Sequence, residues 1–243
     1  MPAGGTCFFG TSQGFVYAVD VATGNARWQK RTGAGVMTDP MPAGDVLAVL
    51  TADGSLLGLD AATGRERWRN ELGDDAATDA REGLAAGIAG GVLFVDGLNG
   101  ALFAVDPATG RLRWKKAGSG PGSRPTGSAG ERDSSFPVVS GGLALVAGED
   151  RISALDLATG AARWEREVAR GRGEQPLISG SLVYHSAGRG MHVLDLRTGR
   201  TRHEFDFRDL GPVLGSARHC TEYKGTVYCA VDDTIVQAVR FTE

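Results

Sequence analysis

The sequence predicts an all-β fold, a β-propeller of four-stranded antiparallel blades with five full repeats and a partial sixth. Two observations carry this prediction. One phrase recurs along the chain at intervals of 39 to 50 residues, which suits one four-stranded sheet per repeat. Between the copies, short segments alternate like strands and are separated by turn-forming dipeptides. Helical repeats of similar length would not be interrupted so often by turn-forming dipeptides.

The recurring phrase runs from a small residue to a tryptophan. It reads small residue, one apolar residue, Asp, two residues, Thr-Gly, three residues and Trp, as in Ala18, Asp20, Gly24 and Trp28. A fifth, degenerate copy has His203 in the place of Trp. The copies share three kinds of residue, an Asp, a Gly and a Trp. These residues are Asp20, Asp60, Asp106, Asp156 and Asp195, Gly24, Gly64, Gly110, Gly160 and Gly199, and Trp28, Trp68, Trp114 and Trp164. We expect these residues to be structural.

Two kinds of turn are predicted in each repeat. Gln13-Gly14, Asp53-Gly54 and Asn99-Gly100 can supply the positive φ that a two-residue hairpin turn requires. The Asp-x-x-Thr-Gly element should close a second hairpin, with Asp accepting hydrogen bonds from N–H groups of the turn and Gly taking the left-handed conformation. We expect a weaker fourth strand to follow each Trp strand, with candidates at 38–42, 136–140, 176–179 and 213–220.

The phrase resembles the tryptophan-docking motif of the pyrroloquinoline-quinone-like (PQQ-like) β-propeller repeat family, and the resemblance covers nearly the whole chain. It implies that the indole of one blade packs against the small residue and the turn glycine of its neighbour. A flat apolar ring needs a residue without bulk opposite it. Ala18, Gly58, Ala104 and Ala154 meet that requirement.

A single propeller domain is expected over residues 1–243, because one closed ring fits this length better than two domains. After Gly225 only two strands are predicted, at 227–231 and 235–240, so the repeats stop midway through a unit. Two interpretations stay open. The ring closes with a two-stranded blade, or the chain is a fragment of a larger ring and exposes an unpaired edge.

Composition limits the classes of partner. The formal net charge of −3 suggests no general attraction to nucleic acid or to an anionic membrane surface. The apolar runs are shorter than the roughly 20 residues of a membrane-spanning helix. Residues 1–9 lack the basic start and long apolar stretch of a secretory signal. We therefore expect an extracytoplasmic protein if the chain is a fragment of a longer one, and a cytoplasmic protein otherwise.

The three cysteines do not suggest a disulfide framework. Cys7, Cys220 and Cys229 have no metal-type spacing, and their number is odd. Cys220 and Cys229 could face each other across adjoining strands. We expect instead that they are unpaired and buried as small hydrophobes.

The resemblance raises the question of catalysis, because the best-known members of the PQQ-like family are quinone-dependent dehydrogenases. In those enzymes the quinone stacks on a Trp beside a calcium ion and a catalytic Asp, often with a pair of adjacent cysteines. This chain has no adjacent cysteine pair, and all four of its tryptophans stand at docking positions. We therefore expect no catalytic, cofactor-binding or metal-binding residues. The alternative is a quinoprotein oxidoreductase that binds PQQ with calcium.

Other candidate sites receive structural interpretations. Asp74, Asp75 and Asp79 could hold calcium but are interpreted as solvated loop carboxylates. His185 and His192 should face each other across a hairpin, where Leu50 and Leu57 stand in the second repeat, and we interpret this pair as a feature of a degenerate repeat rather than a metal site.

Two further segments attract functional hypotheses. The Gly-x-Ser-x-Gly match over residues 10–14 is a predicted hairpin turn and not a nucleophile elbow, which needs a strand-to-helix turn. The long polar segment 118–135 has a composition that favours disorder, with a partner-contacting loop as the alternative.

The sequence therefore favours a noncatalytic propeller that presents a face to a protein partner or a small ligand. The resemblance implies two uses, as a scaffold for bacterial envelope assembly and as the sensor portion of a bacterial serine/threonine kinase. Sequence leaves the oligomeric state open.

Replacement of a docking tryptophan tests the structural role of the phrase. Trp68→Ala should lower the free energy of unfolding by about 3 to 5 kcal/mol, because it removes a large aromatic ring from an apolar contact. Chemical denaturation of the two proteins measures this difference. A near-neutral result would contradict the docking role.

Overall fold

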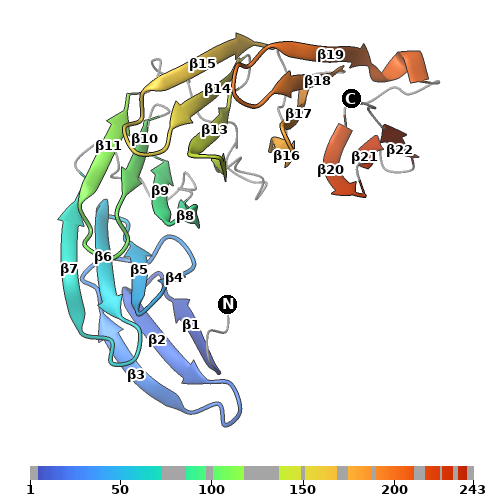
Figure 1. Ribbon diagram of the computed structural model, residues 1–243. Coiled ribbons are helices and arrows are strands. Elements are labelled where there is room, and N and C mark those ends of the chain that lie inside the picture. Colours follow the sequence, from blue (N-terminus) through green and yellow to red (C-terminus); the bar gives the residue numbers. More distant parts are fainter. Residues whose placement is uncertain are drawn as a thin grey trace. The chain divides into compact units, whose positions relative to one another are not determined.

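Figure 1 shows a computed structural model of the chain. The structure describes residues 5–72, 86–96, 101–117, 137–148, 151–168, 175–187, 190–210, 217–224, 226–231 and 235–239. The chain divides into two compact units. One comprises Met1–Arg124 with Ser128–Gly130, and the other comprises Pro125–Gly127 with Glu131–Glu243.

The first unit contains three antiparallel sheets. Its first sheet has the strands β1 (Thr6–Gly10), β2 (Phe15–Asp20) and β3 (Ala26–Arg31) in that order. The second has β4 (Met41–Ala43), β5 (Val46–Leu50), β6 (Ser55–Asp60) and β7 (Glu66–Glu71). The third has β8 (Ala86–Ala89), β9 (Val92–Asp96), β10 (Leu102–Val105) and β11 (Leu112–Lys116).

The second unit also contains three antiparallel sheets. The fourth sheet has β12 (Val138–Ser140), β13 (Leu143–Ala147), β14 (Arg151–Asp156) and β15 (Ala162–Glu167). The fifth has β16 (Leu177–Ser179), β17 (Leu182–Ala187), β18 (Gly190–Asp195) and β19 (Thr201–Asp206), followed by a 3₁₀ helix at Phe207–Leu210. The sixth has β20 (Ala217–Tyr223), β21 (Thr226–Val231) and β22 (Ile235–Val239).

The predicted four-stranded antiparallel sheets are confirmed, but one boundary was wrong. The short strand expected to follow each Trp strand opens the next sheet instead, so that β4 pairs with β5 and not with β3. The turn explains the difference. Ala43 pairs with Val46 across Gly44, whose φ is 64°. A tight hairpin therefore joins β4 to β5, whereas nine residues separate β3 from β4.

Both faces of an inner sheet are packed. On one face of β5 and β6, Leu47 and Leu59 contact the side chains of the first sheet. On the other face, Leu50 and Leu56 contact those of the third sheet. Every residue of β5 is buried, which explains why this strand is apolar at all of its positions. The hydrophobic core of the first unit therefore lies between successive sheets.

The predicted hairpin turns occur where the structure describes them. Gly14 has a φ of 81° and Gly54 a φ of 78°. Residues 10–14 join β1 to β2, so the Gly-x-Ser-x-Gly match is a hairpin turn, as expected. Asn99-Gly100 lies outside the described residues. Among the described residues, no helix has the length and apolar character needed to cross a membrane.

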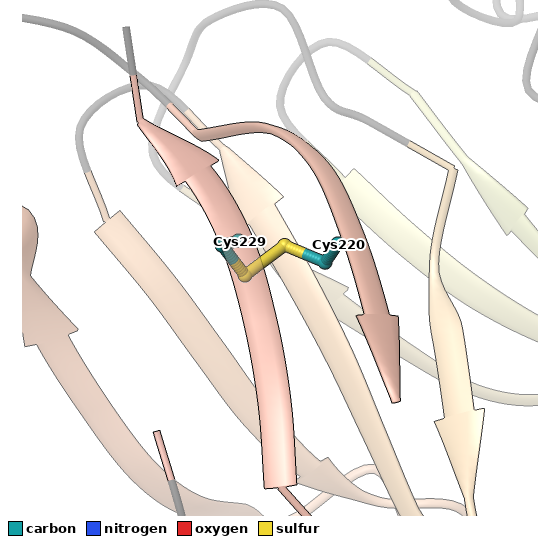
Figure 2. The surroundings of a disulfide bond; sticks show 2 residues. All are labelled: Cys220 and Cys229. Atoms are coloured by element: carbon teal, nitrogen blue, oxygen red, sulfur yellow. A yellow bond between two sulfur atoms is a disulfide. The ribbon is translucent and has the colours of Figure 1, made fainter. Parts of the chain in front are cut away.

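The expectation of unpaired cysteines at the C-terminal end was wrong. Cys220 and Cys229 form a disulfide between β20 and β21, with their Cα atoms 4.1 Å apart (Figure 2). The register explains the pairing, because these two residues are direct partners in the antiparallel ladder. The odd number of cysteines did not exclude a disulfide, because the third cysteine, Cys7, is a free thiol in the first sheet.

Candidate functional site

The repeated phrase folds into one corner per repeat. In the first copy, Oδ1 of Asp20 accepts hydrogen bonds from the N–H groups of Ala22 and Thr23 and from the Thr23 hydroxyl. The N–H of Gly24 donates to the carbonyl of Asp20 at 2.8 Å. The same carboxylate-centred turn is built at Asp60, Asp106, Asp156 and Asp195. Sequence had predicted this turn chemistry.

Sequence reasoning had not assigned a role to the arginine that precedes each tryptophan. Arg27 donates to Oδ2 of Asp20 at 2.5 Å, so the two oxygens of this carboxylate have different partners. The other four pairs are Arg67 with Asp60, Arg113 with Asp106, Arg163 with Asp156 and Arg202 with Asp195. The signal was present in the sequence as an Arg seven residues after every motif Asp, including the copy that lacks Trp.

These ion pairs change the acidity of the motif carboxylates. The hydrogen bond from the arginine is the largest cause, and the turn hydrogen bonds from threonine add to it. Together they lower the pKa of Asp20, Asp60, Asp156 and Asp195 to about 2 and also lower the pKa of Asp106. The carboxylates are thus held in the ionised form by groups of their own corner.

Each described docking contact joins a tryptophan to the turn of the following sheet. A Cβ atom added to Gly64 would lie only 2.6 Å from Cε3 of Trp28, so the six-membered ring of the indole occupies the space that a side chain would need. Trp68 lies against Gly110 in the same way, and Trp164 against Gly199. These glycines have φ between 65° and 71°, a region that L side chains rarely adopt. The glycine therefore serves both the turn and the contact with the indole.

The small residue of the phrase has a different place from the one expected. Ala18 is the cross-strand partner of Trp28 in its own sheet, and Gly58 pairs with Trp68 in the same way. The expectation that the indole meets the small residue of a neighbouring blade was therefore wrong, since directly opposed residues share one face of one sheet. Ala104 with Trp114 and Ala154 with Trp164 follow the same rule. Trp114 is buried, and Gly160 closes its own turn with a φ of 72°.

Additional polar contacts tie the Trp strands to the following sheet. The indole N–H of Trp28 donates to the carbonyl of Ala61 at 3.1 Å, and that of Trp164 donates to Leu196 at 2.9 Å. The side chains two residues after the indole also reach across. Asn70 donates to the carbonyl of Gly110, and Arg166 donates to that of Gly199, both at 2.7 Å.

The histidines of the fifth repeat are only partly as expected. His185 and His192 are direct partners on β17 and β18 and are both buried, so the predicted opposition is confirmed. The register places His185 where Val49 stands in the second sheet, not Leu50, while His192 matches Leu57 as expected. Nδ1 of His192 lies 3.6 Å from a carboxylate oxygen of Glu204 on β19. His203 is exposed, and the side chain of His219 is not among those described.

An acid that sequence reasoning overlooked ends β9. Asp96 pairs with Leu102, as Leu50 pairs with Leu56 in the second sheet, so a carboxyl group stands at a position that is apolar in the neighbouring repeat. Burial raises the pKa of Asp96 to about 7. The signal was an acidic residue at the end of an otherwise apolar strand.

An open cleft of about 510 Å³ lies between β12 and β16 in the second unit. Its lining includes Val138, Val139, Leu177 and Ile178 together with the polar side chain of Gln175. Both strands stand at the end of the strand order of their sheets. Among the described strands, each is paired along one edge only.

Two sets of sequence candidates lie outside the described residues, namely Asp74, Asp75 and Asp79 and the whole of the segment 118–135. Within the part of the chain that the structure describes, no group of three or more His, Cys, Asp and Glu side chains could hold a metal ion. Among the described residues, the indoles of Trp28, Trp68 and Trp164 are occupied by their docking contacts.

A tryptophan-docking corner repeated on successive antiparallel sheets defines the class of PQQ-like β-propeller proteins, and comparisons with known proteins agree. The sequence profile of a family described as outer membrane protein assembly factor BamB matches residues 1–204 and again residues 122–240. The chain belongs to this family. No curated protein matches the sequence.

Two solved structures with TM-scores above 0.5 support the same fold. The computationally designed Ika8 protein is 15% identical with a TM-score of 0.70, over 99% of this chain and 70% of that one. The quinohemoprotein alcohol dehydrogenase from Comamonas testosteroni is 17% identical with a TM-score of 0.55, over 83% of this chain and 41% of that one. BamB from Moraxella catarrhalis is 19% identical with a TM-score of 0.44, over 98% of this chain and 82% of that one. The predicted fold class is confirmed.

Two glycines with the same backbone conformation separate turn strain from indole contact. Gly64 has a φ of 71° beneath Trp28, whereas Gly24 has a φ of 72° and no neighbour within 4 Å of an added Cβ. Both Gly64→Ala and Gly24→Ala should be destabilising, by more than about 1 kcal/mol for the strained backbone. Gly64→Ala should cost at least about 1 kcal/mol more, since the methyl group displaces the ring. Equal losses in chemical denaturation would contradict the docking contact.

The lowered pKa values predict sensitivity to acid. Four of the motif aspartates have a pKa of about 2 in the folded protein and of about 3.9 when unfolded, namely Asp20, Asp60, Asp156 and Asp195. Their contribution to stability is therefore complete above about pH 4 and is lost as the pH falls toward 2. Asp60→Asn should reduce this loss, because the amide does not titrate. Denaturation midpoints measured from pH 5 to pH 2 test the prediction, which fails if both proteins show the same dependence on pH.

Proposed function

We propose that this chain is a noncatalytic propeller scaffold that binds a protein partner, with the cleft between β12 and β16 as the place where an extended segment of the partner docks. The observation that carries the proposal is this cleft, which is bounded by two short strands at the ends of their sheets. Such edges offer backbone N–H and C=O groups to another strand.

The lining of the cleft suits an extended polypeptide. Strand addition gains affinity from main-chain hydrogen bonds and specificity from pockets for alternate side chains. Val138, Val139, Leu177 and Ile178 are half-buried and provide apolar contacts beside the strand edges. Their sizes and apolar character favour a segment with alternating aliphatic residues.

The use of the repeated residues supports a scaffold rather than an oxidoreductase. A quinone would need an aromatic floor and calcium would need several oxygen ligands. The indoles of Trp28 and Trp164 are hydrogen-bonded into the following turns. The motif carboxylates are bonded to their own turns and arginines. These side chains would have to leave the inter-sheet contacts before they could serve a cofactor.

We also propose an extracytoplasmic location and a role in envelope assembly. The disulfide between Cys220 and Cys229 supports this proposal, since disulfides persist mainly in oxidising compartments. The family is described as an outer membrane protein assembly factor, which favours this role over the sensor portion of a kinase.

Site-specific photocrosslinking tests the docking place. A photoreactive amino acid at Ile178, in the cleft, should yield protein adducts in bacterial cells that make this chain in the periplasm, and mass spectrometry should map them to an extended segment. The same group at Leu112, which is 46% exposed on β11, is the matched control and should yield few adducts. Equal labelling from the two positions would contradict the proposal.

A calorimetric titration with PQQ and calcium tests the alternative activity. We expect no saturable heat in a protein shown to be folded. Saturable binding of one quinone per chain would overturn the noncatalytic assignment and favour a dehydrogenase.

A further inference from the structure

The turn between β16 and β17 determines which backbone groups of β16 are available to a partner. Ser179 pairs with Leu182 across a two-residue turn, and Ile178 pairs with Val183 one step further from the turn. In such a hairpin the pair that flanks the turn is hydrogen-bonded, and bonded and non-bonded pairs alternate from there. Ile178 and Val183 are therefore a non-bonded pair, so the N–H and C=O of Ile178 point away from β17.

A hydrogen bond on the other side of β17 supports this assignment. The N–H of Leu196, just after β18, donates to the carbonyl of Ser181 at 2.8 Å. Because successive residues of a strand direct their backbone groups to opposite sides, Val183 bonds in the same direction as Ser181, toward β18. Ile178 therefore has its N–H on the free edge of the fifth sheet. Among the described residues, no hydrogen-bond acceptor for this N–H is found.

Prolines stand at the equivalent edge positions of β4. The register places Pro42 in β4 where Ile178 stands in β16, and Pro40 precedes Pro42 by two residues. Pro176 precedes Ile178 by the same interval. Proline has no N–H and is one of the residues that protect a free strand edge. The edge of β4 thus has no donor at these two positions, whereas the edge of β16 keeps one.

Side-chain direction distinguishes β16 from β12, whose edge carries the N–H of Val139 by the same register. Ile178 pairs with Val183, and both belong to the apolar contact between the fourth and fifth sheets, together with Leu145. Val139 pairs with Ala144, the neighbour of Leu145 in sequence, so it lies on the opposite face of the fourth sheet. Directly opposed strand residues share one face. Only a residue opposite Ile178 would therefore direct its side chain into the cleft.

We propose that the partner segment joins the fifth sheet as an added strand beside β16, that its backbone accepts a hydrogen bond from the N–H of Ile178, and that it places an uncharged aliphatic side chain in the cleft opposite Ile178. This inference rests on the proposed binding at the cleft. The residues that line the cleft are all uncharged, so a charge on the segment at this point would lose its hydration without a counter-charge. Pro176 limits the length of the added ladder, because it offers no donor at the next edge position.

Photocrosslinking with variants of the full chain tests the assigned donor. A photoreactive amino acid at Val138, which lines the cleft from β12, reports docking in the same cells while residue 178 is varied. Ile178→Pro should lower the yield of adducts at least about fivefold, because a carbonyl of the partner loses its hydrogen bond. The variant copies the pattern of β4 and should therefore fold, which circular dichroism checks. Replacement of Ile178 by its α-hydroxy acid removes the N–H without altering the side chain and should give the same loss.

Two controls separate the N–H from other effects of proline. Ile178→Val leaves a side chain with as many carbon atoms as proline but retains the N–H, so its yield should stay close to that of the unaltered chain. Val139→Pro removes the N–H on the edge of β12 and should also leave the yield unchanged.

The outcomes distinguish this inference from the proposed docking place. Equal yields from Ile178→Pro and Ile178→Val would overturn the hydrogen bond, although adducts from the unaltered chain would still support docking in the cleft. A loss with Val139→Pro but not with Ile178→Pro would overturn the choice of β16. The absence of adducts from the unaltered chain at Val138 and at Ile178 would overturn both proposals.

Discussion

The indole of one sheet rests on a glycine in the turn of the next, and the rest of the fold is organised around this contact. Gly64 can lie beneath Trp28 because it has no Cβ. The same property suits its turn, which needs a positive φ that residues with a Cβ rarely adopt. Asp60 holds that turn through three hydrogen bonds, and Arg67 holds the carboxylate from the side. One short phrase therefore encodes a hairpin, an ion pair and half of an inter-sheet contact.

Much of this corner could be predicted from sequence, because its parts lie within a few residues of one another. The turn geometry followed from the types and spacing of residues, whereas the contact between the indole and the glycine of the next turn was implied by the family resemblance. The role of Arg67 was harder to predict, because a register shift between Gly58 and Leu59 sets which residues of β7 reach Asp60. The same kind of irregularity occurs between Ala18 and Val19 and between Ala154 and Leu155. A bulge has no strong signature in a strand of this length.

Other features depend on residues that are far apart or on very short strands. β12 and β16 have three residues each, too few for a periodic pattern, so the sheet to which each belongs could not be assigned with certainty. The cleft between them combines Val139 with Ile178 from different repeats. The disulfide depended on a ladder register that places Cys220 opposite Cys229, and an odd cysteine count concealed it. The prediction for His185 was wrong by one residue, because the length of a hairpin loop sets the register of the strands that it joins.

The hydrogen bonds from Asn70 to Gly110 and from Arg166 to Gly199 have a consequence for folding. Like the indole contacts, they join sheets that are consecutive along the chain. Stability in such an array is close to a sum of nearest-neighbour couplings, and contacts of short sequence separation form without the closure of long loops. A sheet that emerges from the ribosome can thus dock on the one made just before it, so that the chain acquires its structure in the order of its synthesis.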